Sequence, residues 1–173
     1  MTIELDTTNN KVNVPLDLKW AKTQGAWMAA RSGDPIRGVT TPNHGVPEEL
    51  RRLAEAVLRI GGSMVCIPFG EDLQFCNLIT EFGKEIVFGK VILKKEDISD
   101  CHRNSFRLWK KSPEKLKVVM GFGLTDSDQI WRIHTWLLDN KSNLIETTII
   151  RAKYFGFVTN EKFNQAFCEA YGL

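Results

Sequence analysis

Residues 130–148 read IWRIHTWLL-DNKSN-LIETT, two runs rich in β-branched and aromatic residues that are joined by five polar residues. This pattern is typical of two antiparallel strands and their turn. The first run carries His134 and the second Glu146, and their separation of 146 − 134 = 12 is even. A turn centred on Asn140 places the two directly opposite each other, and a turn centred on Lys141 makes them diagonal neighbours. Both registers bring the carboxylate within reach of the imidazole, whereas an odd register would turn it to the other face.

A helix is predicted before this hairpin, over Cys101–Lys111. Ser99 or Asp100 can cap its start, and Pro113 prevents its continuation. Cys101 therefore lies in the first turn, where unpaired backbone N–H groups and the positive end of the helix dipole favour a thiolate. Its own N–H would also point toward an oxyanion on a bound acyl group. The alternative is a small cysteine that only packs against its neighbours.

The other elements indicate an α+β fold. Pro47 at the start and Gly61-Gly62 at the end bound a helix with one buried stripe. Strands are expected at residues 63–69, 85–93, 117–124, 130–138 and 144–158, and a last helix at residues 160–171. The helix that carries the cysteine would pack on an antiparallel sheet, which is the α+β arrangement.

The chain is expected to contain one domain preceded by an arm. Residues 46–173 form the predicted single α+β domain of catalytic type, a length that can bury a core without disulfides. Residues 1–45 are rich in turn-forming residues and predict an irregular arm packed on the domain. A short helix around residues 18–30 would anchor the arm through Trp20 and Trp27.

The composition argues against several classes of function. A net charge of +2 provides no basic field for nucleic acid. The four cysteines are widely spaced and include no C-x-x-C pair, which favours free thiols in a reducing compartment. No secretory signal pattern and no apolar run of membrane-spanning length is visible. We therefore expect a cytoplasmic protein that binds neither nucleic acid nor membrane, although a specialised secretion system could export such a chain.

Three further residues are candidates for substrate binding. Asn104 lies three positions after Cys101 on the same helix face, where it can orient substrate, donate to an oxyanion or hold a neighbouring loop. His102 is expected to point away from the cysteine and can instead make a capping or loop contact. Trp136 shares the strand face of the histidine whereas Trp131 lies on the opposite face, and core packing competes with substrate stacking for both.

The motifs H-T-W at residues 134–136 and L-I-E-T-T at residues 144–148 resemble the strand pair H-x-W and D-x-T of transglutaminase-like proteins, within the papain-like cysteine superfamily. The chain also resembles small uncharacterised bacterial proteins with C-H-x-N, W-x-x-H-[ST]-W, E-T-T and Y-[FY]-G motifs, which fall here between residues 98 and 157. The resemblance implies a papain/transglutaminase-like fold with Cys101 as nucleophile, His134 as base and Glu146 as orienting acid. Two positions depart from the family pattern, because Glu146 replaces the usual aspartate and His102 replaces the aromatic that commonly follows the cysteine.

The expected function is a cysteine-dependent acyl transfer on an amide or ester, with a Cys-His-Glu triad and without metal or cofactor. Water as acceptor would give hydrolysis or glutamine deamidation, and an amine would give a transglutaminase reaction. The substrate would be a protein, a peptide or a small amide, and the oligomeric state is left open. One alternative is zinc bound by Cys101, His102, His134 and Glu146, although adjacent residues of a helix diverge by about a hundred degrees. The other is a non-catalytic protein-binding module on the same scaffold, used by a phage or pathogen against a host protein.

Overall fold

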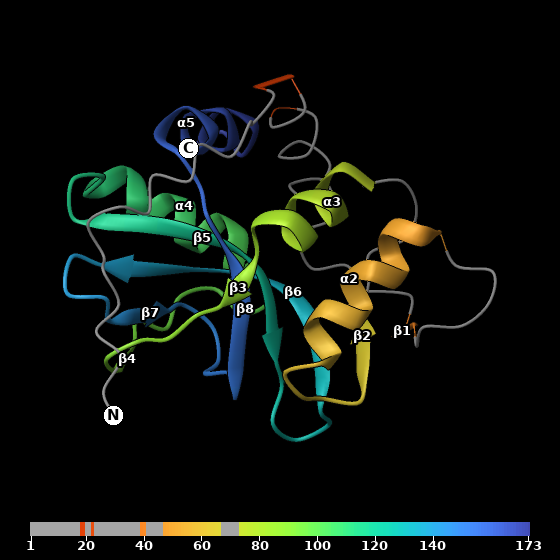
Figure 1. The fold of residues 1–173 in the computed structure, drawn as a ribbon. Coiled ribbons are helices and arrows are strands. Elements are labelled where there is room, and N and C mark those ends of the chain that lie inside the picture. Colours follow the sequence, from red (N-terminus) through yellow and green to blue (C-terminus); the bar gives the residue numbers. More distant parts are fainter. Residues whose placement is uncertain (1–17, 20–21, 23–38, 41–46, 67–72) are drawn as a thin grey trace.

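The computed structural model of the chain describes residues 18–19, 22, 39–40, 47–66 and 73–173. It shows a mixed fold of helices and a mostly antiparallel sheet, with the helices along one side of the sheet (Figure 1). The α+β class is confirmed at that level. In chain order the elements are β1 (Val39–Thr40), α2 (Glu48–Leu58), β2 (Met64–Cys66), α3 (Leu73–Phe82), β3 (Lys84–Glu85), β4 (Val91–Leu93), α4 (Cys101–Lys111), β5 (Leu116–Leu124), β6 (Ile130–Asp139), β7 (Leu144–Glu146), β8 (Lys153–Val158) and α5 (Glu161–Ala170).

The long strand β6 organises the sheet, whose described strands follow the order β1-β2-β6-β5-β8-β3. One edge of β6 pairs with β5 along its whole length. The other edge is shared: residues 130–132 pair in parallel with β2, and residues 137–138 pair antiparallel with β7, which also pairs in parallel with β4. Between these two pairings, residues 133–136 have no strand neighbour on that edge within the described residues. The gap lies where the predicted histidine is.

The two faces of the sheet carry separate groups of buried side chains. Along β6, Trp131 and Leu137 belong to the large core that α2, α3, α4 and α5 cover. Trp136 belongs to a smaller cluster on the opposite face, together with Tyr154 and Val119. The predicted placement of Trp131 and Trp136 on opposite faces is confirmed. His134 shares the period-two face of Trp136, and it lies in the part of β6 to which the start of α4 is bonded through Thr135.

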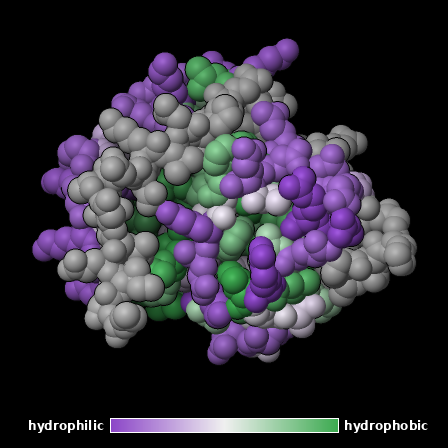
Figure 2. Space-filling view, viewed as in Figure 1, coloured by the Kyte–Doolittle hydropathy of each residue, from purple (hydrophilic) through white to green (hydrophobic). Residues whose placement is uncertain are grey.

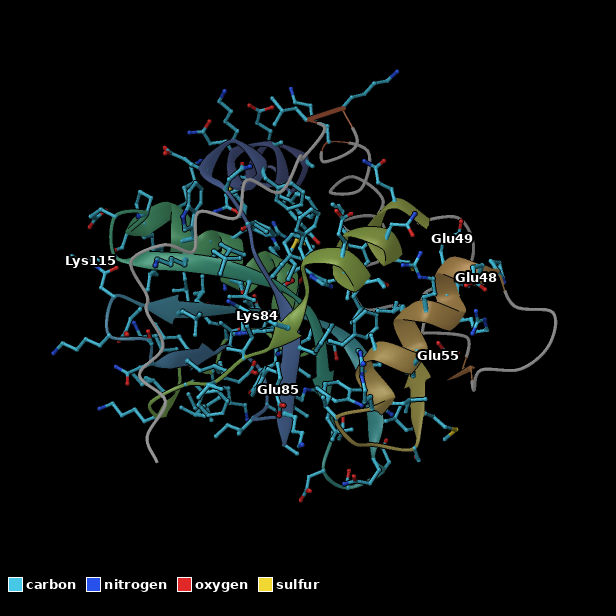
Figure 3. All side chains as sticks on the ribbon, viewed as in Figure 1. Glu48, Glu49, Glu55, Lys84, Glu85 and Lys115 are labelled. Carbon is cyan, nitrogen blue, oxygen red and sulfur yellow. The ribbon has the colours of Figure 1, made fainter. Side chains whose placement is uncertain are left out.

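Helix α2 shows how the exterior is arranged. Leu53, Ala54 and Val57 are buried under it, whereas Glu48 and Glu55 point outward (Figure 3). Its start at Pro47 and its end before the glycine pair match the prediction. On the face drawn in Figure 2, hydrophilic side chains form the outer rim and hydrophobic ones gather in the recesses between them. This is the usual distribution for a domain with a buried apolar core.

Three parts of the predicted secondary structure are wrong. Residues 85–93 do not form one strand, because the chain leaves the β8 edge of the sheet after β3 and joins β7 as β4. Residues 144–158 form two strands, because the backbone N–H groups of Thr147 and Thr148 bond the Glu146 side chain instead of a neighbouring strand. The prediction also contained no helix where α3 lies.

The predicted arm is only partly covered by the described residues. The proposed anchors Trp20 and Trp27, and most of the predicted helix at residues 18–30, lie outside them. Val39–Thr40 falls within the range predicted to be irregular, yet it forms β1 and pairs antiparallel with β2.

Candidate functional site

The nucleophile candidate is the first residue of α4. The helix runs over Cys101–Lys111 as predicted, and Cys101 is 9% exposed. Asp100 is the N-cap residue and its carbonyl accepts from the N–H of Asn104 at 2.9 Å, but its side chain makes no capping hydrogen bond. Neither predicted cap therefore competes for the N–H groups of the first turn, and the positive end of the helix is directed at the sulfur's position.

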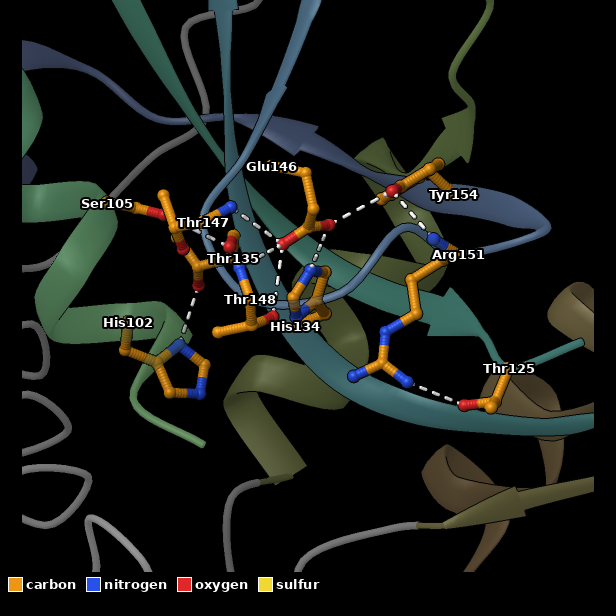
Figure 4. A network of polar contacts seen from close by, with 10 residues as sticks. All are labelled: His102, Ser105, Thr125, His134, Thr135, Glu146, Thr147, Thr148, Arg151 and Tyr154. Carbon is orange, nitrogen blue, oxygen red and sulfur yellow. Dashed lines mark hydrogen bonds and ion pairs between the residues drawn. The ribbon is translucent and has the colours of Figure 1, made fainter. Parts of the chain in front are cut away.

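The predicted contact between His134 and Glu146 is present. Nε2 of His134 donates to Oε2 of Glu146 over 2.8 Å, and the side chains are 1% and 0% exposed (Figure 4). The strands pair Leu137 with Ile145 and Leu138 with Leu144, so each pair sums to 282. The turn is therefore centred on residue 141, and Glu146 is the diagonal neighbour of the histidine rather than its direct partner.

The Glu146 carboxylate is held by four more hydrogen bonds. Oε1 accepts from the N–H of Thr147 at 2.8 Å and from both the N–H and the hydroxyl of Thr148, at 3.0 and 3.1 Å. Oε2 also accepts from the hydroxyl of Tyr154 at 3.0 Å. Burial alone would raise the pKa of the carboxyl group, but the imidazole of His134 and these donors together hold the pKa below its usual value. The carboxylate is therefore charged and fully satisfied, as a buried charge must be.

The thiol of Cys101 interacts with two imidazoles. Burial raises the pKa of the thiol, yet His102 and His134 outweigh burial and hold the pKa well below the usual value. Burial likewise lowers the pKa of His134, but the thiolate and Glu146 reverse this and raise the pKa to about 9. Nδ1 of His134 is buried and makes no hydrogen bond of ordinary geometry to any described residue. It is the nitrogen left to exchange a proton with the sulfur, and such contacts are often loose in unliganded sites.

Glycines make room for the rings of the site. A Cβ at Gly156 would lie 2.9 Å from Cη2 of Trp136, and a Cβ at Gly123 would lie 3.3 Å from Cδ2 of His134 and 2.8 Å from Cγ of Arg151. The stem of Arg151 thus lies beside the candidate base. Sequence reasoning missed this arrangement, although the alternation Met120-Gly121-Phe122-Gly123 on a strand signals a close approach by another group.

Trp136, predicted among the substrate-binding residues, is fully buried. Its ring stacks on His134 with centroids 5.9 Å apart and contacts Tyr154 at 5.1 Å. In this arrangement the tryptophan supports the imidazole from the side of the core rather than opening toward solvent. Tyr154 was not among the predicted site residues. The Y-F-G motif was the available signal for it, and the E-T-T motif was the signal for Thr148.

The other two predicted substrate-binding residues lie at the start of α4. Asn104 is fully buried, and its Nδ2 donates to the carbonyl of Asp97 at 2.7 Å, which holds the loop before the helix. His102 was expected to point away from the thiol, but it interacts with Cys101 and shares a 2.6 Å hydrogen bond between its Nδ1 and Oγ1 of Thr135. The expectation was wrong because a strand neighbour, rather than helical periodicity, sets the orientation of the ring.

The residues proposed for zinc do not converge as ligands. Nε2 of His134 faces Glu146 and Nδ1 of His102 faces Thr135. In the described part of the chain, no group of three or more His, Cys, Asp or Glu side chains is arranged to hold a metal ion.

None of the helices in the described ranges is both long enough and apolar enough to span a bilayer. Comparisons with protein-family models, with curated protein sequences and with solved structures found no match for this chain.

Proposed function

We propose that the protein catalyses cysteine-dependent acyl transfer on an amide or ester. One observation carries this proposal: a thiol at a helix start interacts with a buried imidazole whose far nitrogen is bonded to a fully buried carboxylate. The carboxylate fixes the imidazole tautomer with Nε2 protonated, which turns Nδ1 toward the thiol. The thiolate and imidazolium then form an activated nucleophile with its acid–base partner.

The reaction follows from these positions. The Cys101 sulfur forms a bond to the carbonyl carbon while the carbonyl π electrons move to oxygen. When the C=O bond forms again, the bond to the leaving nitrogen or oxygen breaks, and the proton on Nδ1 of His134 passes to the leaving group. Water or an amine then attacks the thioester, gives its proton to His134 and releases the thiolate. Glu146 stabilises the imidazolium throughout by its bond to Nε2.

We propose a papain/transglutaminase-like arrangement for the fold. Its support is the chain order of a cysteine at a helix start, a histidine on a long antiparallel strand and an acid on the next strand. His102 and Ser105 of α4 bond Thr135, in the part of β6 that has no strand neighbour on that edge among the described residues.

The substrate class proposed is a protein, a peptide or a small amide. Hydrolysis, glutamine deamidation and transfer to an amine share the same acyl-enzyme and differ only in which acceptor reaches it.

The test uses unfolded glutamine-containing proteins as acyl donors. Ammonia release and incorporation of a fluorescent primary amine are measured for the wild type, Cys101→Ala and the control Cys168→Ala, which removes another buried thiol. We expect activity in the wild type and the control and none in Cys101→Ala. Equal activity in all three proteins would contradict the thiol mechanism. Absence of activity on amide and ester panels would favour the non-catalytic binding module.

A further inference from the structure

A second imidazole lies beside the proposed nucleophile, and the triad does not use it. His102 follows Cys101 directly on α4, and its Nδ1 is 2.6 Å from the hydroxyl of Thr135 on β6 (Figure 4). Ser105, one turn later on the same helix, donates its hydroxyl to the carbonyl of Thr135 at 3.1 Å. The first two turns of α4 are therefore each attached to the same fully buried strand residue. This attachment fixes where the ring of His102 can point.

The two nitrogens of His102 have different surroundings. Nδ1 is occupied by Thr135, whereas no hydrogen bond of ordinary geometry engages Nε2 among the described residues. The ring is half-buried, and Nε2 is the nitrogen that the contact with Thr135 leaves for another partner. If the hydroxyl of Thr135 donates to Nδ1, the neutral ring carries its proton on Nε2; a protonated ring carries a proton there as well. In both states Nε2–H is a hydrogen-bond donor.

The negative charges at the site would be stabilised by such a hydrogen-bond donor. A Cys101 thiolate and the Glu146 carboxylate are two negative charges, and the His134 imidazolium balances only one. Four further hydrogen-bond donors stabilise the charge of Glu146. The charge on the sulfur has fewer partners, namely the N–H groups at the start of α4 and the ring of His102. After burial, which raises the pKa of the thiol, the charge interaction with His102 is the largest influence and lowers it. During attack the negative charge moves from sulfur to the adjacent carbonyl oxygen, so a donor that serves the sulfur is close to the oxygen.

We propose that His102 is a second catalytic imidazole, which holds the Cys101 thiolate in the resting protein and, through Nε2–H, donates a hydrogen bond to the acyl oxygen as charge leaves the sulfur. No proton is transferred in this role: the bond to oxygen strengthens as the C=O bond opens and weakens when it forms again. His134 remains the group that moves the proton. The inference rests on the proposed acyl-transfer function and assigns the oxyanion contact within it.

Two reagents distinguish stabilisation of the thiolate from stabilisation of the oxyanion. Iodoacetamide alkylates the thiolate without forming an oxyanion, whereas p-nitrophenyl acetate acylates it through one. The rate of each reaction at Cys101 is measured from pH 5 to 10 by intact mass and by p-nitrophenolate release. His102→Asn keeps an amide near the Nδ1 position, and His102→Gln places one near the Nε2 position. Thr135→Val retains the imidazole but removes its anchor. Thermal unfolding of each variant confirms that it is folded.

At pH values where the thiolate is fully formed, His102→Asn should be alkylated as fast as the wild type but acylated about tenfold or more slowly, as for loss of an oxyanion donor. His102→Gln should recover part of the acylation rate, and Thr135→Val should lose acylation more than alkylation. If both reactions change by the same factor at every pH, or if neither changes, the oxyanion role is wrong while the triad stands. If wild-type Cys101 is alkylated rapidly yet never acylated, the proposed function itself fails, and this inference fails with it.

Discussion

Replacing Glu146 by Gln tests the buried ion pair without changing its shape. The side chain accepts five hydrogen bonds, three at Oε1 and two at Oε2. A glutamine with its carbonyl at the Oε1 position keeps the three donors from Thr147 and Thr148. Its NH₂ group then faces Nε2 of His134 and the hydroxyl of Tyr154, both of which are donors in the wild type. To avoid two opposed donors, the imidazole must move its proton to Nδ1 and remain neutral.

The expected loss of unfolding free energy follows from the number of hydrogen bonds that change. The three retained bonds become neutral, and two charge-assisted bonds, worth about 1.5–3 kcal/mol each, are lost or inverted. Removing one partner of a buried ion pair typically costs about 3–5 kcal/mol. We therefore expect Glu146→Gln to lower the free energy of unfolding by about 4 kcal/mol. For a chain of 173 residues this corresponds to a fall of roughly 10 °C in Tm. The neutral imidazole should also raise the pKa of the Cys101 thiol.

Urea unfolding and the pH profile of Cys101 alkylation measure the two effects. Glu85→Gln is the control, because Glu85 forms a half-exposed 3.6 Å ion pair with Lys153 on the surface (Figure 3). Such pairs contribute little, so the control should change the unfolding free energy by less than about 1 kcal/mol. Equal stability of Glu146→Gln and the control would refute the argument that a buried charge holds His134. An unchanged alkylation profile would refute its link to the thiol.

The pH dependence of this difference has a defined sign. The pKa of His134 is raised from an ordinary value of 6.5 to about 9, so its contribution is complete below pH 6.5 and is lost as the pH rises through 9. The pKa of Glu146 is lowered, so its contribution is complete above an ordinary value of 4.5 and is lost as the pH falls through the folded-state pKa. The stability gap between wild type and Glu146→Gln should therefore be largest between pH 4.5 and 6.5.

Three further outcomes are expected. Brief treatment with iodoacetamide at neutral pH should label Cys101 well before Cys66 or Cys168, because burial raises the pKa values of the latter two thiols. Peptide mass spectrometry measures the labelling of each cysteine, and equal labelling would contradict an activated thiol at Cys101. Ammonia release from glutamine-containing proteins should decline as the pH rises through about 9, where His134 loses the proton that the leaving nitrogen needs, and a rate that climbs steadily to pH 10 would contradict this role of the imidazolium. Gly123→Ala should slow acylation at least several-fold in a folded protein, because its Cβ would press on the imidazole; an unchanged acylation rate would show that the ring needs no room there.

The helix that carries the nucleophile was predictable from the sequence because its boundaries are set by local signals. Pro113 acts within one turn of the helix end, and the observed bounds match, although the side chain of Asp100 at the N-cap position makes no capping hydrogen bond. The sequence left two possible registers for the β6–β7 pair. The even spacing of His134 and Glu146 determines that they share a face of the sheet, but it does not determine the residue on which the turn is centred. Oδ1 of Asp139 accepts from the N–H groups of Lys141 and Asn143, which centres the turn on residue 141. That choice depends on turn geometry, which apolar patterning does not reveal.

Two of the errors have a common physical cause in long-range contacts. A continuous apolar pattern at residues 85–93 is compatible with one strand, but β3 and β4 join opposite parts of the sheet, and nothing local indicates the crossing. The orientation of His102 was wrong for the same reason, because Thr135, 33 residues away, sets it. The contact between His134 and Glu146 could be predicted because both residues belong to one hairpin. Its support from Tyr154 could not, since that residue arrives from a different strand.

The ionisation state of the site depends on two features that act on opposite sides of His134. Four donors besides the imidazole bind Glu146, and together with His134 they hold the pKa of its carboxyl group below the usual value. The imidazole therefore faces a carboxylate at Nε2, which favours its protonated form. That alone would not ionise the thiol, since burial raises the pKa of Cys101. His102 and His134 supply the stabilisation on the sulfur side. We therefore expect that loss of either the acid on β7 or the second imidazole on α4 raises the pKa of the Cys101 thiol.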